Sequence, residues 1–363
     1  MYELIHEDEK SGARAGIINT KHGAVETPAF MPVATKGSVK TLSSEDLADI
    51  GVQALIANAF LLYLKPGVGV VENSGGLHEF MNWRKVIFTD SGGFQMLRKD
   101  FLVRVSKKGI TFKSPFDNSR HLVTPEKCIQ VQNALGSDVA MVLDDLPPYG
   151  SECERTAESV KRTIDWAKRC KDAHGSEEQG LFAIVQGGVF EDLRRECAGK
   201  LVELGFDGYG LGGLSIGEPK EKMFEIIERT PLPVEKARYL MGVGSPMELL
   251  ESISRGMDLF DSAFPTRNAR HNMVYTKKGR YDLSRGKYAD DFTPLEEDCE
   301  CQACRKYTRG YISHLLKVRE FLGMRLVTVH NLYFLQKLMK DAREAIMRDE
   351  FVEFKSGLID RVG

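Results

Sequence analysis

The feature of this 363-residue sequence that most restricts its fold is a regular alternation of short apolar runs with longer amphipathic segments. The runs are AFMPVA (29–34), ALIANAF (54–60), VIFTDSGG (86–93), VAMVLDD (139–145), LFAIVQGG (181–188), GYGLGGL (208–214), YLMGVG (239–244) and LFDSAFP (259–265). Helix start and stop signals lie between them, at Ser43 or Ser44, at Thr124 followed by Pro125, and at Gly205. Parallel strands joined by crossover helices produce this pattern. The eight runs favour an α/β fold, a closed (β/α)8 TIM barrel, over an open doubly wound sheet.

The chain outside these runs predicts three further parts. We expect the barrel, with an N-terminal cap, to occupy residues 1–290. Residues 103–124 alternate with period two and turn at Lys108-Gly109, which predicts a β-hairpin inserted after the third strand. Residues 291–331 predict a zinc-binding subdomain, and residues 332–363 predict C-terminal helices that pack back on the barrel.

Composition narrows the class of protein. The chain is 42% hydrophobic and 28% charged, enough for a sizeable core in an ordinary soluble protein. It has no apolar run near the roughly eighteen residues of a membrane span, and its acidic N-terminus does not look like a signal peptide. Seven cysteines in this length favour a reducing compartment over a disulfide framework, so we expect a cytoplasmic protein. The net charge of −2 means that any contact with nucleic acid would rest on local basic patches.

Polar residues stand at the same end of several runs. Asp90, Asp144, Asp145, Gln186 and Asp261 all fall at the C-terminal ends of predicted strands. In a parallel barrel this end is the mouth, where active sites are built. A single carboxylate there is often a helix N-cap or half of a surface ion pair. Because several strands deliver polar groups to one rim, we interpret Asp261 as a reactive group.

A basic segment follows Asp261 directly. Residues 267–287 contain seven Lys or Arg and the single acid Asp282. Such a run is usually a solvated face, but its position after a mouth carboxylate favours a clamp for the phosphates of a polynucleotide. Upstream, Ser245-Pro246-x-Glu248 predicts a capping box at a helix start, a place that attracts phosphate.

A cysteine cluster predicts a metal site. CECQAC supplies Cys299, Cys301 and Cys304, and His330 lies downstream. Three thiolates and one imidazole form a closed tetrahedral set for a structural Zn²⁺, one per subunit. For His330, an ordinary histidine at a helix start is the alternative.

Several long motifs together resemble the tRNA-guanine transglycosylases, or queuine tRNA-ribosyltransferases, of the bacterial and eukaryotic catalytic-subunit type. The motifs are DSGGFQ (90–95), DD (144–145), VQGG (185–188), GLGGLSIGEP (210–219), YLMGVGSP (239–246), FDSAFPTRNAR (260–270) and the cysteine cluster with its distant histidine. The resemblance covers nearly the whole chain in the same order. It implies a transferase that exchanges a guanine in tRNA for a 7-deazaguanine base, on a barrel that carries a zinc subdomain.

The resemblance also implies residue roles. Asp261 would be the nucleophile that holds the ribose covalently, as in retaining glycoside hydrolysis, and Asp90 the general acid/base. The base would be bound by Asp90, Ser91, Gly92, Gly93, Phe94, Asp144, Gln186, Gly213, Leu214 and Met241. The RNA would be bound by Gly242, Val243, Gly244, Ser245, Pro246, Met247, Glu248, Thr266, Arg267, Asn268, Ala269 and Arg270. For Met241, an ordinary core role is the alternative.

Some positions bear on substrate choice. Ser262 stands where many bacterial members have cysteine, a change with no obvious cost to the chemistry. Leu146 also stands where bacterial members often have cysteine; like the eukaryotic valine it favours queuine, but added bulk cannot create space. Ile216 stands where bacterial members have valine and eukaryotic members glycine, and its bulk favours 7-aminomethyl-7-deazaguanine over the larger queuine as the incoming base. The chain ends at Gly363, shortly after the zinc ligands, which favours the anticodon wobble guanine of G-U-N tRNAs over the D-arm target of archaeal members.

The expected assembly is a homodimer. Tyr307, Tyr311 and His314 recur at helical spacing in the predicted zinc subdomain, through which the family's dimers pair. Helical aromatics at this spacing are more often ordinary core, but this small subdomain has little core of its own.

Three other functions share some of these sequence features. A non-catalytic RNA-binding subunit is disfavoured by the presence of both Asp90 and Asp261. A zinc hydrolase is disfavoured because a Cys3His set leaves the metal no open position for water. A related transglycosylase acting on another nucleic acid, such as DNA, is the alternative that the sequence excludes least firmly.

Overall fold

A computed structural model describes residues 1–362 and confirms the predicted barrel. Eight parallel strands close in the order β10-β11-β12-β13-β14-β4-β5-β6. Their bounds are β4 Ala29–Ala34, β5 Ala54–Asn58, β6 Val86–Asp90, β10 Val139–Met141, β11 Gly180–Val185, β12 Gly208–Leu211, β13 Ala237–Leu240 and β14 Leu259–Ser262. Each of the eight apolar runs contributes one strand. The strands are buried almost throughout because crossover helices cover their outer faces.

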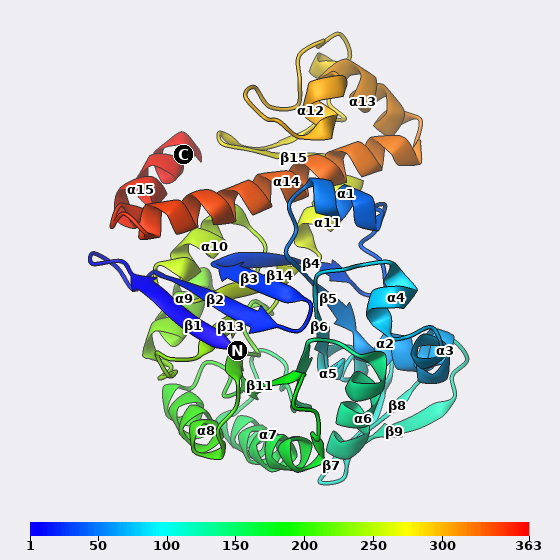
Figure 1. The fold of residues 1–363 in the computed structure, drawn as a ribbon, viewed down its shortest axis with the longest axis vertical. Helices are drawn as coiled ribbons and strands as arrows, with labels where there is room; N and C mark the ends of the chain where they lie inside the picture. The colour runs from blue at the N-terminus through cyan, green and yellow to red at the C-terminus, as the bar shows by residue number, and fades with distance from the viewer. Residues whose placement is uncertain (363) are drawn as a thin grey trace.

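The helices that follow the strands surround the barrel (Figure 1). They are α1 Ser44–Asp49, α2 Ala59–Leu62, the π-helix η1 Tyr63–Gly67, α3 Val68–Asn73, α4 Leu77–Met81, α5 Gly93–Met96, α6 Pro125–Leu135, α7 Cys153–Ala173, α8 Glu191–Leu204, α9 Lys220–Arg229, α10 Pro246–Ile253 and α11 Phe264–Arg270. Ser43 caps α1 in a capping box with Asp46, the Thr124 hydroxyl caps α6, and α8 ends at Gly205 with φ +72°. The predicted start and stop signals are confirmed at these three places.

A small antiparallel sheet closes the end of the barrel opposite the mouth. It consists of β1 Tyr2–Glu7, β2 Arg14–Thr20 and β3 Gly23–Thr27. Arg14 donates from Nη2 to Oδ2 of Asp258 at 2.8 Å, and Asp258 immediately precedes β14. His22 lies 2.8 Å from Asp138, which immediately precedes β10. Because the N-terminal ends of parallel strands meet at one end, these contacts place the sheet over the base of the barrel.

The base also holds a cluster of His22, His78 and Asp138, whose side chains include three possible metal ligands. The two imidazole rings stack with centroids 3.6 Å apart and planes 21° apart. Their in-plane nitrogen lone pairs therefore run side by side instead of converging on one ion. Each ring is within hydrogen-bond distance of one oxygen of the same carboxylate, at 2.8 and 3.1 Å. We interpret this cluster as the anchor that ties the β2–β3 turn to the barrel.

The insertion after the third barrel strand is more elaborate than predicted. The expected hairpin of residues 103–124 is corrected to a three-stranded antiparallel sheet of β7 Leu102–Ser106, β8 Gly109–Lys113 and β9 Arg120–Val123. The turn at Lys108-Gly109 is present, but the chain reverses again within residues 114–119. An alternation of period two identifies extended chain and does not by itself count strands.

The C-terminal part of the chain lies across the barrel. It contains the hairpin β15 Met273–Thr276 and β16 Gly279–Asp282, the 3-10 turn η2 Gly286–Tyr288, and the helices α12 Gln302–Lys306, α13 Arg309–Lys317, α14 Phe321–Ile346 and α15 Phe351–Val362. In Figure 1, α14 runs between the barrel and the α12–α13 pair. It carries His330 towards the cysteines, and Gln336 donates from Nε2 to the Phe30 carbonyl of β4 at 2.9 Å. The expected division between residues 331 and 332 therefore falls inside one continuous helix, and Gly363 lies outside the described residues.

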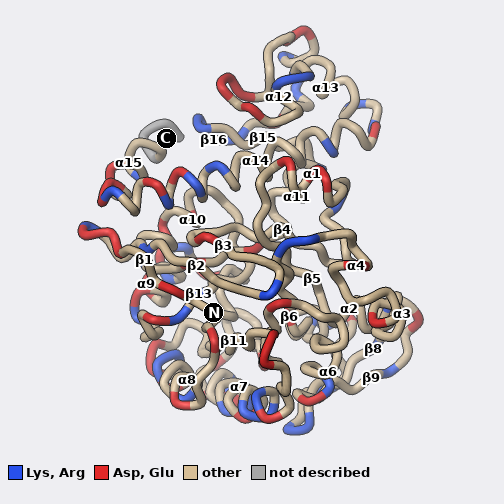
Figure 2. The backbone as a smooth tube through the Cα atoms, viewed as in Figure 1, with Lys and Arg blue, Asp and Glu red and all other residues tan. Residues whose placement is uncertain are grey.

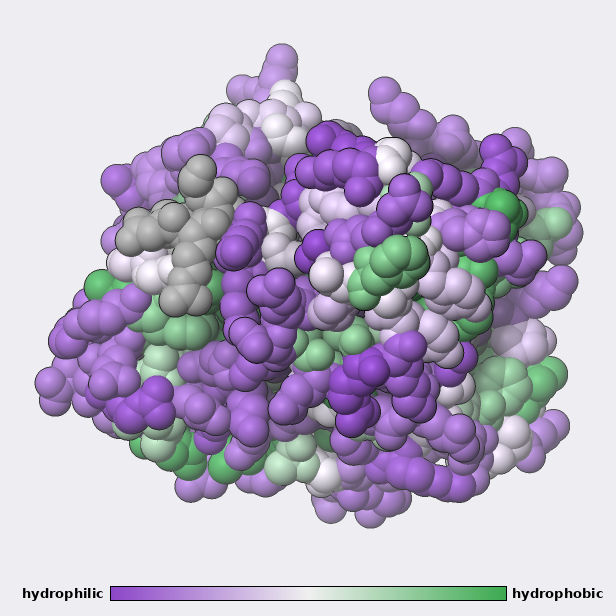
Figure 3. Space-filling model, turned by 90° about the horizontal axis from the view of Figure 1, so that it is seen from above, coloured by the Kyte–Doolittle hydropathy of each residue, from purple (hydrophilic) through white to green (hydrophobic). Residues whose placement is uncertain are grey.

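The surface is mixed in charge. No helix among residues 1–362 is long and apolar enough to cross a bilayer. Acidic and basic residues intermingle along α7 and α8, whereas Lys and Arg mark the β15–β16 hairpin (Figure 2). On the face in Figure 3, hydrophilic residues predominate and hydrophobic ones form separate patches. The basic hairpin is thus a local feature of a chain with almost balanced charge.

Candidate active site

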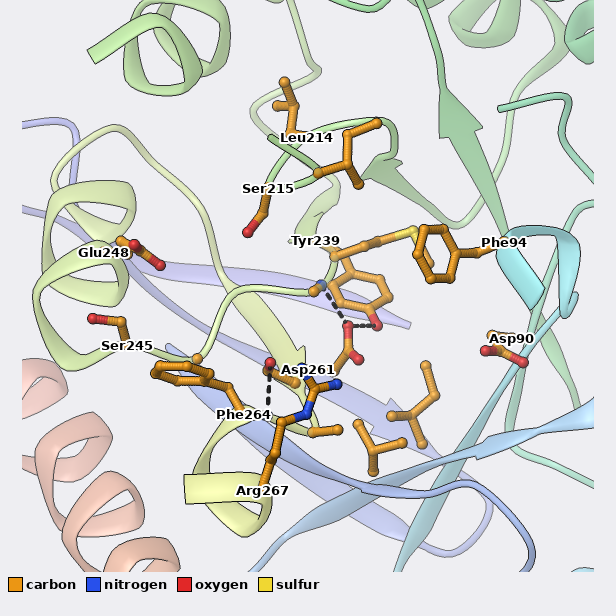
Figure 4. Close-up of a pocket in the computed structure, with 18 of the residues that line it drawn as sticks. Asp90, Phe94, Leu214, Ser215, Tyr239, Ser245, Glu248, Asp261, Phe264 and Arg267 are labelled. Atoms are coloured by element: carbon orange, nitrogen blue, oxygen red, sulfur yellow. Dashed lines mark hydrogen bonds between the residues drawn. The ribbon is translucent and has the colours of Figure 1, made fainter. Parts of the chain in front are cut away.

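The C-terminal ends of the barrel strands surround a cavity of about 850 Å³. The predicted site residues that line it are Asp90, Ser91, Gly92, Gly93, Phe94, Asp144, Gln186, Gly213, Leu214, Met241, Gly242, Gly244, Ser245, Pro246, Met247, Glu248, Asp261 and Arg267. In Figure 4, Asp261 lies between Asp90 on one side and Ser245 and Glu248 on the other. The structure therefore brings together the predicted catalytic and base-binding residues.

Asp261 is held at one oxygen only. The Tyr239 hydroxyl donates to Oδ1 at 2.6 Å, and the Gly242 N–H donates to the same oxygen at 3.0 Å (Figure 4). Among the described residues, nothing donates a hydrogen bond to Oδ2. Burial raises the pKa of Asp261 above its ordinary value, and the two hydrogen bonds oppose part of that rise. The result is an oriented carboxylate with one free oxygen, which is what a nucleophile requires.

Asp90, at the end of β6, lies in a different environment. Asn58 donates from Nδ2 to its Oδ2 at 2.9 Å, and Oδ1 is buried with no hydrogen-bond partner in the described chain. Burial, together with the negative charge of Asp261, raises the pKa of Asp90 to about 7. A carboxyl group with this pKa can both give and take a proton near neutral pH.

Asp144 and Asp145 are adjacent in sequence but have different environments. Asp144 lines the cavity, accepts a hydrogen bond from Nε2 of Gln186 at 2.6 Å, and has its pKa raised to about 6 by burial. Asp145 is fully buried and pairs with Arg155 at 3.0 Å and Arg162 at 2.8 Å on α7. Of the DD pair, Asp144 alone faces the cavity, and Asp145 anchors a helix.

Arg194 organises the rim although sequence reasoning missed it. This residue of α8 is buried, and burial lowers its pKa to about 10. Its guanidinium donates to the carbonyls of Val185 at 3.0 Å, Gly188 at 2.9 Å and Gly213 at 3.5 Å. It thereby ties the end of β11 to the end of β12. No sequence signal identified it, because an arginine in a charged helix is usually exposed.

Tyr239 and Asn58 were also missed, although each had a signal. Asn58 ends β5 as Asp90 ends β6, and the two are register partners. The rule that selected Asp90 applies to Asn58 equally. Tyr239 lies within a buried apolar strand, where a tyrosine hydroxyl needs a hydrogen-bond partner.

Gly92 is required by packing within the protein. Its φ is +73°, and a Cβ atom there would lie 2.1 Å from Cβ of Phe60. The resemblance places Gly92 among the residues that bind the base. At Gly92 the close approach is to a neighbouring helix residue.

Several predicted RNA-binding residues do not reach the cavity. The side chains that are buried elsewhere are those of Val243, Thr266, Asn268 and Ala269. Asn268 donates to the Tyr275 hydroxyl at 2.8 Å, which joins α11 to β15. The Arg270 guanidinium donates to the Thr266 carbonyl at 2.8 Å within its own helix, whereas Arg267 lines the cavity. Thr266, Asn268 and Ala269 can act on a ligand only by shaping α11, and Val243 only by shaping the loop between β13 and α10.

The predicted capping box at α10 is not formed. Ser245 precedes the helix in an extended conformation, but its side chain makes no capping hydrogen bond. The Glu248 carboxylate instead pairs with Nζ of Lys220 from α9 at 2.6 Å. The predicted helix start is confirmed. The predicted capping box is wrong because Lys220, which is distant in sequence, competes for the Glu248 carboxylate.

The cysteine cluster fits a tetrahedral metal. Nδ1 of His330 lies 3.6, 3.6 and 3.3 Å from the sulfur atoms of Cys299, Cys301 and Cys304. Sulfur and nitrogen ligands on one tetrahedral Zn²⁺ would be about 3.6 Å apart. Nε2 of His330 lies 2.7 Å from the Tyr275 carbonyl, so the proton belongs on Nε2 and Nδ1 is free to bind metal. The four residues can hold a metal ion, and His330 lies in the middle of α14, not at a helix start.

Comparison with known proteins gives a consistent result. Residues 8–362 match the sequence model of the family described as queuine tRNA-ribosyltransferase. The chain is 50% identical to the queuine tRNA-ribosyltransferase of Thermoanaerobacter sp. (strain X514), covering 100% of this chain and 97% of the relative. It is 50% identical to that of Fusobacterium nucleatum, over 98% and 96% of the two chains. It is 48% identical to that of Staphylococcus aureus (strain JH9), over 100% and 96%.

Proposed function

The chain belongs to the queuine tRNA-ribosyltransferase family and is a pentosyltransferase, and we propose that it exchanges the wobble guanine of G-U-N tRNAs for a 7-deazaguanine base. The observation that carries this proposal is the state of Asp261. One oxygen is held by Tyr239 and Gly242, and the other is free in a cavity shared with Asp90. This arrangement suits displacement at an anomeric carbon.

In the proposed first step, Oδ2 of Asp261 attacks C1′ of the target ribose. The bond from C1′ to N9 of guanine breaks, its electron pair leaves with the base, and Asp90 supplies a proton to the departing guanine. The product is an ester between Asp261 and the ribose, and the phosphodiester chain stays intact.

In the second step the incoming base displaces Asp261 from C1′ by the reverse of these bond changes. Asp90, now ionised, takes the proton from the ring nitrogen of the incoming base, which attacks C1′ and releases the Asp261 carboxylate. Two displacements at one carbon preserve its configuration, as in retaining glycoside hydrolysis. A pKa of about 7 suits Asp90 for both directions of proton transfer.

The same cavity offers groups for base recognition. Asp144 can accept from the ring and exocyclic N–H groups of a guanine edge, and Gln186 can donate to its carbonyl oxygen. Phe94 is 56% exposed at the cavity edge, where its ring can stack on the base. The target nucleotide must leave its stack to reach these groups, with Arg267 and the basic segment 267–287 holding the neighbouring phosphates.

For the incoming base we propose 7-aminomethyl-7-deazaguanine in preference to queuine. Ile216 and Leu146 both line the cavity. A branched side chain at 216 occupies volume that the cyclopentenediol of queuine would need, which corresponds to roughly tenfold discrimination or more. Competition of the two bases for one unmodified tRNA tests this, and a clear advantage for queuine contradicts it.

We propose that the cysteine cluster holds a structural Zn²⁺. Zinc there would crosslink the loop of Cys299 and Cys301 to α14 through His330, and none of its ligands lines the cavity. Cys301→Ala should therefore impair folding or assembly and leave the catalytic step alone. A folded, metal-free variant that binds tRNA normally and has no turnover contradicts a structural role.

We also propose a homodimer that pairs through the zinc-binding region. The Tyr311 ring stacks on Tyr307 with centroids 5.6 Å apart, yet Tyr311 is 42% exposed. Val318 and Phe321 nearby on the chain are 54% and 77% exposed. Apolar side chains gathered at this level of exposure are typical of an interface. Light scattering at micromolar concentration tests it, and a fully active monomer refutes it.

The function itself is tested with labelled guanine. Wild-type protein should incorporate it into an unmodified tRNA with a G-U-N anticodon, and neither a wobble-adenine tRNA nor duplex DNA should serve. Incorporation into DNA in preference to tRNA would favour the related transglycosylase on another nucleic acid.

A further inference from the structure

An exposed aromatic ring at the barrel mouth is flanked by two lysines, which we call the Lys36–Phe116–Lys65 platform. Phe116 is 42% exposed in the turn between β8 and β9. Nζ of Lys36 lies 5.4 Å from its ring centroid, and Nζ of Lys65 lies 5.7 Å from it. The three residues come from three separate segments, so only the tertiary structure assembles the platform.

The platform borders the cavity on the side of Asp90. Lys36, Lys65 and Phe116 follow β4, β5 and β6, which are neighbours in the barrel. Lys36 comes directly after Thr35, which lines the cavity, and the contacts of Lys36 and Lys65 with the Phe116 ring keep the platform at this end of the barrel. The basic segment 267–287 follows β14, on the other side of β4. The cavity thus has cationic groups on both flanks.

The side chains that the structure describes do not compensate the charge of the platform. Among them, no carboxylate oxygen lies within 4.0 Å of Nζ of either lysine. The nearby carboxylate of Asp117 accepts hydrogen bonds from the N–H and hydroxyl of Ser119 at 3.1 and 2.7 Å. These bonds hold Asp117 within its own turn, where it pairs with neither lysine. Two ammonium groups that converge on one ring repel each other, and an anion between them would relieve that repulsion.

We propose that the Lys36–Phe116–Lys65 platform binds a nucleotide of the tRNA anticodon loop flanking the target base, with its base on the Phe116 ring and its phosphates on the two lysines. This proposal rests on the proposed function. A single-stranded loop offers unstacked bases together with phosphates, the two partners that this platform lacks. The basic segment 267–287 would hold the strand on the other side of the extruded nucleotide.

The test measures binding of a fluorescent anticodon stem-loop RNA by the full-length protein at several salt concentrations. Phe116→Ala should weaken binding about tenfold, within the range known for the loss of one stacked base. The double variant Lys36→Gln/Lys65→Gln should make the slope of log K against log salt shallower by about 1.4, since each phosphate contact on single-stranded RNA contributes about 0.7. The matched control Lys161→Gln/Lys168→Gln removes two exposed lysines from α7 and should change neither.

Exchange of labelled guanine is measured in parallel. The platform variants should raise KM for the RNA, keep KM for guanine, and keep kcat at saturating RNA. Wild-type exchange combined with unchanged RNA binding in both variants overturns the platform and leaves the proposed function standing. Wild-type protein that binds the RNA without any exchange contradicts the proposed function, and weaker binding by the platform variants then still supports the platform. Loss of a dimer by light scattering in the platform variants, with RNA binding per protomer intact, makes the platform a protein contact and overturns it.

Discussion

The two ends of the barrel both bury carboxylates, and they differ in the hydrogen-bond donors that surround them. At the base, Asp258 accepts two hydrogen bonds from Arg14, at 2.9 and 2.8 Å, and one from the Arg238 N–H at 2.7 Å. Burial raises the pKa of Asp258, and these donors oppose part of that rise. Burial raises the pKa of Asp138, but hydrogen bonds involving His78, the Ile87 N–H and His22 outweigh it and hold the pKa below its usual range.

At the mouth the carboxylates have fewer hydrogen-bond donors around them. Burial raises the pKa of Asp90 to about 7 and of Asp144 to about 6, and one oxygen of Asp261 accepts no hydrogen bond from the described residues. Burial alone therefore does not define a reactive carboxylate. What matters is whether the protein supplies the compensating donors or leaves them to a ligand.

The largest effect is expected from removal of the mouth nucleophile. Asp261→Asn should reduce guanine exchange to background and abolish a denaturation-resistant complex with tRNA, because an amide cannot form the ester. Its stability should be at least that of the wild type, since a buried charge is removed. Gel mobility under denaturing conditions provides the measurement. If the complex persists in this variant and disappears in Asp90→Asn, the two roles are reversed.

Removal of a partner at the base should affect folding and spare catalysis. Arg14→Met leaves Asp258 as an uncompensated buried charge and should lower the free energy of unfolding by about 3–5 kcal/mol. Urea denaturation measures it, with exchange activity per folded molecule unchanged. The exposed Lys10→Met is the control and should have no measurable effect. A loss of activity in folded Arg14→Met would mean that the two ends are coupled.

Asp144 at the mouth and Asp138 at the base should give opposite dependences of stability on pH. With its pKa raised to about 6, Asp144 binds its proton more tightly in the folded protein than in the unfolded chain. Its contribution therefore decreases as pH rises from about 4 to about 6, by about 2–3 kcal/mol in total. Asp144→Asn should remove this decrease in urea titrations across that range.

Asp138 provides the contrast for that experiment. Because its folded-state pKa is lowered, its stabilising contribution is present above the pKa of the unfolded chain and is lost as the pH falls. Asp138→Asn should therefore flatten the acid side of the stability profile. Equal slopes in both variants would show that Asp144 and Asp138 do not differ electrostatically.

The smallest effect is expected at the hydrogen bond that orients the nucleophile. Tyr239→Phe should lower kcat about thirtyfold, since a hydrogen bond to a charged group contributes about 2 kcal/mol. That bond lowers the pKa of Asp261, so its loss should move the acid limb of the pH–rate profile to higher pH. Tyr209→Phe removes another buried tyrosine hydroxyl, 3.2 Å from the Phe206 N–H, and serves as the control with unchanged kcat.

Much of the fold could be predicted because it depends on local pattern. Each of the eight apolar runs became a barrel strand, and the residues at their ends, such as Asp90 and Asp261, meet at one cavity. The three cysteines and His330 also come together as expected. Apolar runs, caps and the closely spaced cysteines are encoded within a few residues of chain, and burial follows directly from them. His330, 26 residues beyond Cys304, is not encoded locally in this way.

Tertiary structure decided which partner each polar group has. The sequence does not show that Asp144 faces the cavity while Asp145 binds α7, or that Glu248 pairs with Lys220 in place of a capping box. It also does not show that Arg194 spans two strand ends. These contacts join residues far apart in the chain, and barrel closure and strand register set their distances. Local sequence thus determined where each residue lies along its element, and the closed barrel determined what it meets there.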